Sequence, residues 1–406
     1  MYQLFKMAFR DLGRNKRRSI LSSLAVAVGV ALLLLIASVL AGEMRGALQN
    51  SIQLQSGHLQ VRAATYDENK ISLKWEDLIA APQEIIDQLK TIPQVKFATP
   101  RLIASGIVTL KDNSRGVQVI GIDPASEANQ PFRQGMIAGD FLTPDDREGI
   151  IIGAPLAEKF NVQVGDQVSL LINRSSGDTD EQLFTVRGIY TTNTSNYDES
   201  TVFMPLVKAQ AFAGAENHAS LIFVMLQDQA QAEAVAAALQ GSNYQILSWQ
   251  KLNEITVQLE DFARSYMVVF YLIILGITAT VVVNTLVMAV FERTREIGIL
   301  AAIGMKGRRI MSMFLAEGAL LATGGVIGGL LLGGIAVAYF TKYGIYIGDY
   351  GVTGVLMGNT IYAYLTAQDA INLSIAAYVI TLIASLYPAV LAARMEPIEA
   401  LHGLGD

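Results

Sequence analysis

Cysteine is absent from the 406 residues, and histidine occurs only three times, at His58, His218 and His402. Without cysteine the chain forms no disulfide framework, no thiol nucleophile and no cysteine-linked lipid anchor. The three histidines lie far apart, and no His/Cys/carboxylate cluster has the spacing of metal ligands. The sequence therefore predicts neither a metal site nor thiol chemistry.

Motifs of the common catalytic sites are also missing. No Gly-Lys dipeptide occurs, which excludes a Walker A phosphate loop, and neither G-x-S-x-G nor H-E-x-x-H is present. We therefore predict no catalytic residues and no cofactor on this chain, so that any ATP and Mg²⁺ would be bound by a partner. Basic residues flank apolar runs without interleaved aromatic residues, which argues against a nucleic-acid partner.

Charge is scarce within four long apolar runs. The run Tyr266–Val290 has no charged residue, and Met311–Phe340 has only Glu317, although 16% of the whole chain is charged. Ser19–Gly42 and Ala370–Ala393 are similar in length, and about 20 apolar residues in a helix cross a bilayer. We predict an α-helical membrane protein with four transmembrane helices, plus a large α+β extracytoplasmic domain inserted between helices 1 and 2.

Positive charge indicates which loops face the cytoplasm. Residues 1–18, 291–310 and 394–406 together hold 12 Lys and Arg against 6 Asp and Glu, whereas residues 43–265 hold 17 against 27. Both termini are therefore predicted to be cytoplasmic. The predicted order is an amphipathic N-terminus at 1–18, membrane helices at 19–42, 266–290, 311–340 and 370–393, an outer domain at 43–265, a cytoplasmic coupling segment at 291–310, an outer loop at 341–369 and a cytoplasmic tail at 394–406.

The segment Phe291–Arg309 is strongly charged and helix-prone. Its apolar residues are spaced as on one face of a short amphipathic helix, and its glutamates and arginines occupy another face. Such a helix suits docking on a cytoplasmic partner, with Ile297, Leu300 and Ile303 in an apolar groove; the alternative is a basic loop that only fixes orientation. The candidate coupling residues are Phe291, Glu292, Arg293, Thr294, Arg295, Glu296, Ile297, Gly298, Leu300 and Ile303, with Glu292, Arg293, Arg295 and Glu296 expected to pair with charges at the rim of the groove.

Helical spacing also continues outside the membrane on both sides of the outer domain. The residues that carry this pattern are Leu48, Ile52, Leu252, Ile255 and Leu259. We expect two helical stalks that pack together. Between them, Pro82–Leu110 and Gln229–Leu247 each read as a helix followed by a strand, which predicts one subdomain built from both ends of the domain and a second one inserted at about 136–219.

Small residues recur at every fourth position within Met311–Phe340, which lets another helix approach closely, within the chain or across a dimer. These helix-packing residues are Gly324, Gly325, Gly328, Gly329 and Gly333. Glu317 is a functional candidate as an intramembrane carboxylate, although we expect it to reach towards Arg308 or Arg309. Pro388 is expected to break the fourth helix near its inner end.

Three motifs resemble one family. The stretch Phe291-Glu-Arg-Thr-Arg-Glu-Ile-Gly-Ile-Leu-Ala-Ala-Ile-Gly304 resembles the coupling-helix signature of MacB/FtsX-like ABC transporter permeases. Tyr387-Pro-Ala-Val-Leu-Ala-Ala-Arg-Met-Glu-Pro-Ile-Glu-Ala-Leu401 is similar to their C-terminal signature, and Met7-Ala-Phe-Arg-Asp-Leu-Gly-Arg-Asn-Lys-Arg-Arg-Ser19 to their start. The layout without a fused ATPase, and Gln55-Ser-Gly-His-Leu-Gln-Val61 after the first stalk, resemble most the lipoprotein-releasing (LolC/LolE-like) branch.

This resemblance implies a non-catalytic permease subunit in a bacterial inner (cytoplasmic) membrane. The implied partners are two copies of a separate ABC ATPase, a second permease subunit in a homo- or heterodimer, membrane lipids and a lipoprotein substrate or periplasmic adaptor. Mechanotransmission from the ATPase to the outer domain would then drive lipoprotein or lipid release. Alternatives are drug or peptide efflux with an adaptor, an FtsX-type regulator of a cell-wall hydrolase, and a membrane-anchored ligand sensor.

The predicted topology can be tested by labelling, because the native chain has no cysteine background. Cysteines introduced at Asn113 and Gly177 should react with a membrane-impermeant thiol reagent added from outside. Cysteines at Gly307 and Gly405 should react only after the membrane is permeabilised. Labelling of position 307 from outside would contradict the four-span topology.

Overall fold

The computed structural model describes residues 10, 16–67, 70–111, 113–239, 244–348 and 355–395. Most of the expected amphipathic segment at 1–18 and of the tail at 394–406 lies outside these residues. The chain forms two compact units. The helical unit comprises Met1–Glu43, Asp261–Ile345 and Ile361–Asp406, and the α+β unit comprises Met44–Glu260 and Tyr346–Thr360.

Within the part of the chain that the structure describes, four helices are long and apolar enough to cross a membrane, which confirms the four predicted spans. Helices α2 and α10 contribute residues to both units. Since a bilayer offers the backbone no water, a helix is the form in which each of these runs satisfies its own polar groups. The helices are α2 (Lys16–Ser51), α10 (Glu254–Glu292), the short α11 (Thr294–Ala302), α12 (Gly307–Tyr343) and α13 (Ala367–Ala393).

Helix α13 corrects the expectation about Pro388. The helix continues through this residue to Ala393, with Pro388 buried inside it. Proline removes only one backbone donor, so a helix packed along its length can continue past it.

The end of α13 crowds the start of α12. The Ala393 carbonyl oxygen lies 2.7 Å from the position of a Cβ atom at Gly307, so the exposed Lys306 is a less disruptive labelling position.

Glycines on α12 allow α2 to approach closely within the same chain. A Cβ atom at Gly329 would lie 2.5 Å from Val30 Cβ and 2.8 Å from the Ala27 carbonyl oxygen. Gly325 and Gly333 meet α2 in the same way, and Gly324 and Gly328 border it. The buried residues of this core come from all four long helices: Val26, Val30, Leu33, Leu34, Leu275, Val282, Leu286, Leu321 and Ala377. Of the two predicted uses of the glycines, the fold shows the one within the chain.

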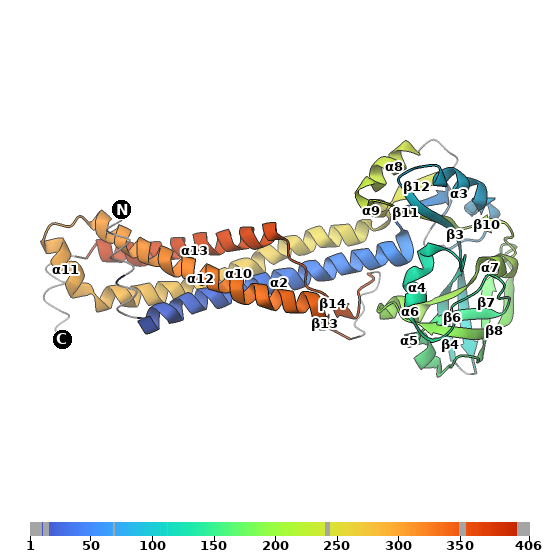
Figure 1. Ribbon diagram of the computed structural model, residues 1–406, viewed down its shortest axis with the longest axis horizontal. Helices are drawn as coiled ribbons and strands as arrows, with labels where there is room; N and C mark the ends of the chain where they lie inside the picture. Colours follow the sequence, from blue (N-terminus) through green and yellow to red (C-terminus); the bar gives the residue numbers. More distant parts are fainter. Residues whose placement is uncertain are drawn as a thin grey trace. The chain divides into compact units, whose positions relative to one another are not determined.

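The α+β unit is built on a ten-stranded sheet with helices packed on it (Figure 1). Its inserted position between the first two spans confirms the predicted fold class. In chain order its elements are the π-helical turn Ile52–Ser56, β1 (Leu59–Ala63), the 3₁₀ turn Trp75–Asp77, β2 (Ile79–Ala80), α3 (Pro82–Lys90), β3 (Val95–Leu110), β4 (Asn113–Ile122), the 3₁₀ turn Glu127–Asn129, α4 (Gln130–Gln134), β5 (Met136–Gly139), β6 (Gly149–Gly153), α5 (Ala154–Phe160), β7 (Gln167–Asn173), β8 (Thr179–Tyr190), α6 (Ser195–Ser200), β9 (Thr201–Pro205), α7 (Leu206–Ala213), β10 (His218–Ala219), β11 (Leu221–Leu226), the 3₁₀ turn Gln229–Gln231, α8 (Ala232–Ala238), β12 (Tyr244–Ser248) and α9 (Trp249–Leu252). A further two-stranded sheet is formed by β13 (Ile345–Tyr346) and β14 (Thr360–Ile361).

The first subdomain joins both ends of the insertion. Its strands lie in the order β12-β1-β11-β3, and each neighbouring pair is antiparallel. Helix α3 lies between β1 and β3 in the chain, and α8 lies between β11 and β12, which gives a split β-α-β arrangement. Apolar residues of these elements form one core, including Leu59, Ile86, Val224 and Val235. The predicted helix–strand pairs therefore fold together.

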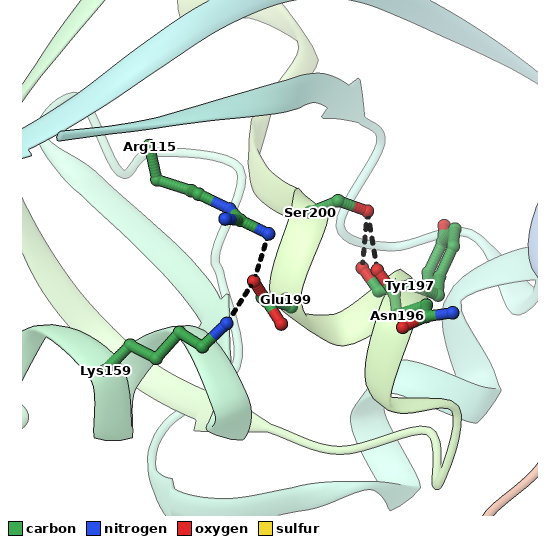
Figure 2. Close-up of polar contacts among 6 residues, drawn as sticks. All are labelled: Arg115, Lys159, Asn196, Tyr197, Glu199 and Ser200. Atoms are coloured by element: carbon green, nitrogen blue, oxygen red, sulfur yellow. Dashed lines mark hydrogen bonds and ion pairs between the residues drawn. The ribbon is translucent and has the colours of Figure 1, made fainter. Parts of the chain in front are cut away.

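The second subdomain is inserted into the first through the long strand β3. Residues Val95–Arg101 of β3 pair with β11, and Leu102–Leu110 pair with β4. The core of this subdomain includes β6 and α5, which were not predicted. Two ion pairs connect α6 to neighbouring elements of this subdomain. Glu199 of α6 forms ion pairs with Arg115 of β4 and, at 2.6 Å, with Lys159 of α5 (Figure 2).

The predicted stalk contacts are only partly present within one chain. Ile52 is fully buried and Leu48 and Leu252 are half-buried, but Ile255 and Leu259 are 73% and 41% exposed. The expectation that Ile255 and Leu259 pack against the first stalk is therefore wrong for the single chain. Asn253, directly before α10, and Thr256 of α10 are buried instead. Asn253 bonds to Ser51, and its amide also donates to Ser56 Oγ at 3.0 Å.

The close approach of α12 and α2 gives a stability prediction. Gly329→Leu should lower the free energy of unfolding by about 1–3 kcal/mol, because an added side chain overpacks the contact with Val30. Gly334→Leu is the matched control, since nothing lies within 4 Å of a Cβ atom there. Thermal unfolding of both variants in detergent checks this. Equal unfolding temperatures would contradict the packing described.

Candidate coupling site

Helix α11 is short, and its two ends are set by local chemistry. It starts at Thr294, whose hydroxyl donates to the Phe291 carbonyl oxygen at 2.8 Å, and Glu296 places a negative charge in the first turn. At the other end Gly304 adopts φ +94°, which glycine tolerates without strain. The amides of Gly304 and Met305 donate to the carbonyls of Ala301 and Leu300, both at 3.0 Å. This is a Schellman ending, and it turns the chain directly into α12.

One face of α11 is part of the helical unit. Ile297 is 1% exposed and packs with Val290 of α10, Phe314 of α12 and Ala389 of α13. Gly298 is also buried, and Ala301 packs against the same cluster. Burial of an isoleucine side chain contributes roughly 1.5–3 kcal/mol. The expectation that Ile297 fills a groove on a partner is therefore wrong, because its side chain is already enclosed within this chain.

The opposite face of α11 is exposed, and so are the end of α10 before it and Ile303 directly after it. Phe291, Ile299 and Ile303 are 54%, 43% and 79% exposed. The charged side chains of Glu292, Arg295 and Glu296 are exposed beside them, while Thr294 and Leu300 are half-buried. Ile299 was not among the predicted residues. We name Phe291, Ile299 and Ile303, with Glu292, Arg295 and Glu296, the coupling face.

Arg293 and Glu317 form a buried ion pair. The distance from Arg293 Nη1 to Glu317 Oε2 is 3.6 Å, and the two side chains are 10% and 7% exposed. A small cavity beside them is bordered by Ser19 of α2, Thr285 of α10 and Leu321 of α12. Two expectations are corrected: Glu317 pairs with Arg293 instead of Arg308 or Arg309, and Arg293 lies inside the helical unit instead of at the rim of a groove.

The chain matches two family descriptions in succession. Residues 19–242 match the MacB-like periplasmic core domain, and residues 268–397 match the FtsX-like permease C-terminal region. The chain is 25% identical to the lipoprotein-releasing system transmembrane protein LolE of Haemophilus influenzae over 94% of this chain and 93% of the relative. It is 27% identical to the lipoprotein-releasing system transmembrane protein LolC of Neisseria meningitidis over 98% of both chains.

A third relative is the macrolide export ATP-binding/permease protein MacB of Acinetobacter baylyi. It is 22% identical over 98% of this chain but only 59% of the relative. The periplasmic region of MacB from Actinobacillus actinomycetemcomitans is similar in structure over 52% of this chain and 96% of that chain, with a TM-score of 0.36 and 13% identity.

Among the described residues, four helices can span a membrane, the α+β domain lies between the first two of them in the chain, and the short helix α11 lies between the second and third. The first family description alone covers more than half of the chain. The chain belongs to the MacB/FtsX-like family of ABC transporter permeases. It is thus an inner-membrane protein, and membership of this family implies an ATPase partner.

The buried ion pair gives a second stability prediction. Glu317→Leu should destabilise the helical unit by about 3–5 kcal/mol, because Arg293 would keep a buried charge without this partner. The double variant Arg293→Met with Glu317→Leu should recover most of this loss. Chemical unfolding in detergent measures both, with exposed Glu292→Leu as the control that changes stability little. A double variant as unstable as the single one would show that the pair is not the cause.

Proposed function

We propose that this permease passes the force of ATP hydrolysis on a separate ATPase to its α+β unit, and that the process releases or exports a lipoprotein. The chain would form a dimer with a second permease subunit, and two copies of the ATPase would bind to this dimer. The segment containing α11 would face the cytoplasm, because short loops rich in Lys and Arg are favoured on that side of the membrane.

The observation that carries this proposal is that one face of α11 is buried in the helical unit while the opposite face is exposed. One face is held by Ile297 and by the Arg293–Glu317 pair, so a push on α11 is delivered to α10, α12 and α13. The coupling face remains open, with apolar anchors beside charges of both signs. Interfaces commonly combine such anchors with a charged rim. A loop that served only for orientation would need positive charge but no ordered exposed apolar face.

Helices α2 and α10 offer a route from this site. Each is a single helix with residues in both units. At their α+β ends, Ser51 and Ser56 bond to Asn253, and the Trp249 amide donates to the His58 carbonyl oxygen at 3.0 Å. Because a helix is stiff along its axis, a shift of α10 relative to α2 would act on the sheet through these contacts.

Similarity to the lipoprotein-releasing proteins supports the lipoprotein as substrate, since both relatives are covered almost completely. Export of a small molecule is the second candidate, and the similarity to the macrolide exporter favours it. The name of that relative combines an ATP-binding and a permease part, and this chain covers 59% of its length.

Substitutions on α11 test the coupling proposal. Ile299→Asp should weaken ATPase binding by about tenfold or more, because it buries a carboxylate in an apolar contact while leaving the fold intact. Lys306→Gln, exposed in the same segment but outside α11, should retain binding. The measurement is co-purification of the ATPase and its ATP turnover in reconstituted membranes. Ile297→Asp should instead lower the yield of folded protein.

Retention of binding and turnover in Ile299→Asp would contradict the proposal that the coupling face binds the ATPase.

The substrate is tested separately in vesicles that contain either a fluorescent triacylated lipoprotein or a macrolide. ATP-dependent loss of the lipoprotein from the vesicles supports release. Transport of the macrolide alone would favour the second candidate.

A further inference from the structure

A cavity of about 380 Å³ lies within the α+β unit where helices α2 and α10 reach the sheet. Its walls come from the π-helical turn that ends α2, from β1, β3 and β4, and from the residues around the start of α10. A volume of this size accommodates a small molecule or a headgroup. Amide and hydroxyl side chains are frequent in the lining, including Gln55, Gln60, Gln118, Asn253 and Thr256.

Arg101 of β3 lines this cavity and is 2% exposed. Its Nη1 atom donates to the Leu54 carbonyl oxygen at 2.8 Å, and the guanidinium lies over the Phe223 ring with 4.0 Å to the centroid. Its Nε and Nη2 atoms have no hydrogen-bond partner among the described residues. Burial lowers the pKa of Arg101 to about 10, so the side chain stays charged at neutral pH.

A buried guanidinium charge is costly unless an opposite charge lies near it. Lining charges do not balance it. Arg62 and Lys251 add two positive charges to that of Arg101, and Glu254 is the one carboxylate among the lining residues that the structure gives. Arg62 is engaged with the Gln60 oxygen at 2.7 Å, and Glu254 accepts from Gln258 at 3.0 Å. The lining thus has a net charge of +2.

We propose that this cavity binds a phosphate monoester, which would neutralise the positive charge of Arg101 in the cavity wall and contact the exposed Lys251 at the entrance. A phosphate monoester carries −1.5 to −2 charges near neutral pH, which matches the lining, whereas a carboxylate carries only one. The group can belong to a soluble molecule or to a lipid headgroup, and the polar lining fits either body. The site is independent of the proposed coupling to an ATPase.

Thermal unfolding of the full chain in detergent tests the site. The probes are inorganic phosphate, glycerol 3-phosphate and dihexanoyl phosphatidic acid, at constant ionic strength set with sodium chloride. Dihexanoyl phosphatidylcholine is the lipid control without a monoester. We expect a concentration-dependent rise in unfolding temperature with a monoester probe. Glycerol 3-phosphate as the stronger probe indicates a soluble ligand, and phosphatidic acid as the stronger one indicates a lipid.

Two variants locate the effect. Arg101→Met should weaken the response about tenfold or more, since it removes the buried positive charge that the anion neutralises. Lys251→Gln should weaken the response several-fold without risk to the fold, because Lys251 is exposed on α9. If Arg101→Met does not fold, Lys251→Gln alone tests the proposal. Lys74→Gln removes an exposed lysine outside the cavity and should respond like the parent chain. No response to any monoester, or equal responses in Lys251→Gln and Lys74→Gln, would overturn the proposal.

Discussion

Two opposite charges held away from water, Arg293 and Glu317, fix the junction between α11 and the long helices. A buried pair tolerates little separation, because each partner alone would be an uncompensated charge. Residues of α2, α10 and α12 border the same small cavity, so the pair depends on the positions of three helices at once. The enclosed side chain of Ile297 strengthens the same junction. As a result α11 cannot shift freely against the helices, and the coupling face inherits their rigidity.

Much of the fold could be predicted from the sequence, because strong physical constraints produced the relevant patterns. A bilayer demands uninterrupted apolar helices, so all four spans were evident. The helix–strand pairs at both ends of the domain, Pro82–Leu110 and Gln229–Leu247, gave the split subdomain. Strand β6 was missed because Gly149–Gly153 is a short apolar run without alternation, buried throughout.

The site was predicted less well than the fold. In a helix of nine residues, apolar side chains occur on both faces, so spacing alone could not tell the enclosed Ile297 from the exposed Ile299. The partner of Glu317 was missed because Arg308 and Arg309 are nearer in sequence. Arg293 follows the end of α10, which lies beside α12 at this cavity and brings Arg293 close to Glu317. The spacing of the glycines in α12 predicted a close helix contact, but only the structure identified α2 as the partner. Arg101 gave no signal in the sequence, because a single arginine in a strand is usually exposed.

The split subdomain has a consequence for the order of folding. Strand β1 pairs with β11 and β12, so Leu59 finds its partners only at Val224 and Ser248. A chain synthesised from its N-terminus can close the inserted subdomain first, since the core of that subdomain extends only from Leu73 to Ala215. The split subdomain cannot complete its sheet before β12 has been synthesised. Helix α10 begins shortly after β12, at Glu254. The sheet of the split subdomain is therefore completed only as the second membrane helix is being made, and until then the edges of β1 stay open to wrong pairing.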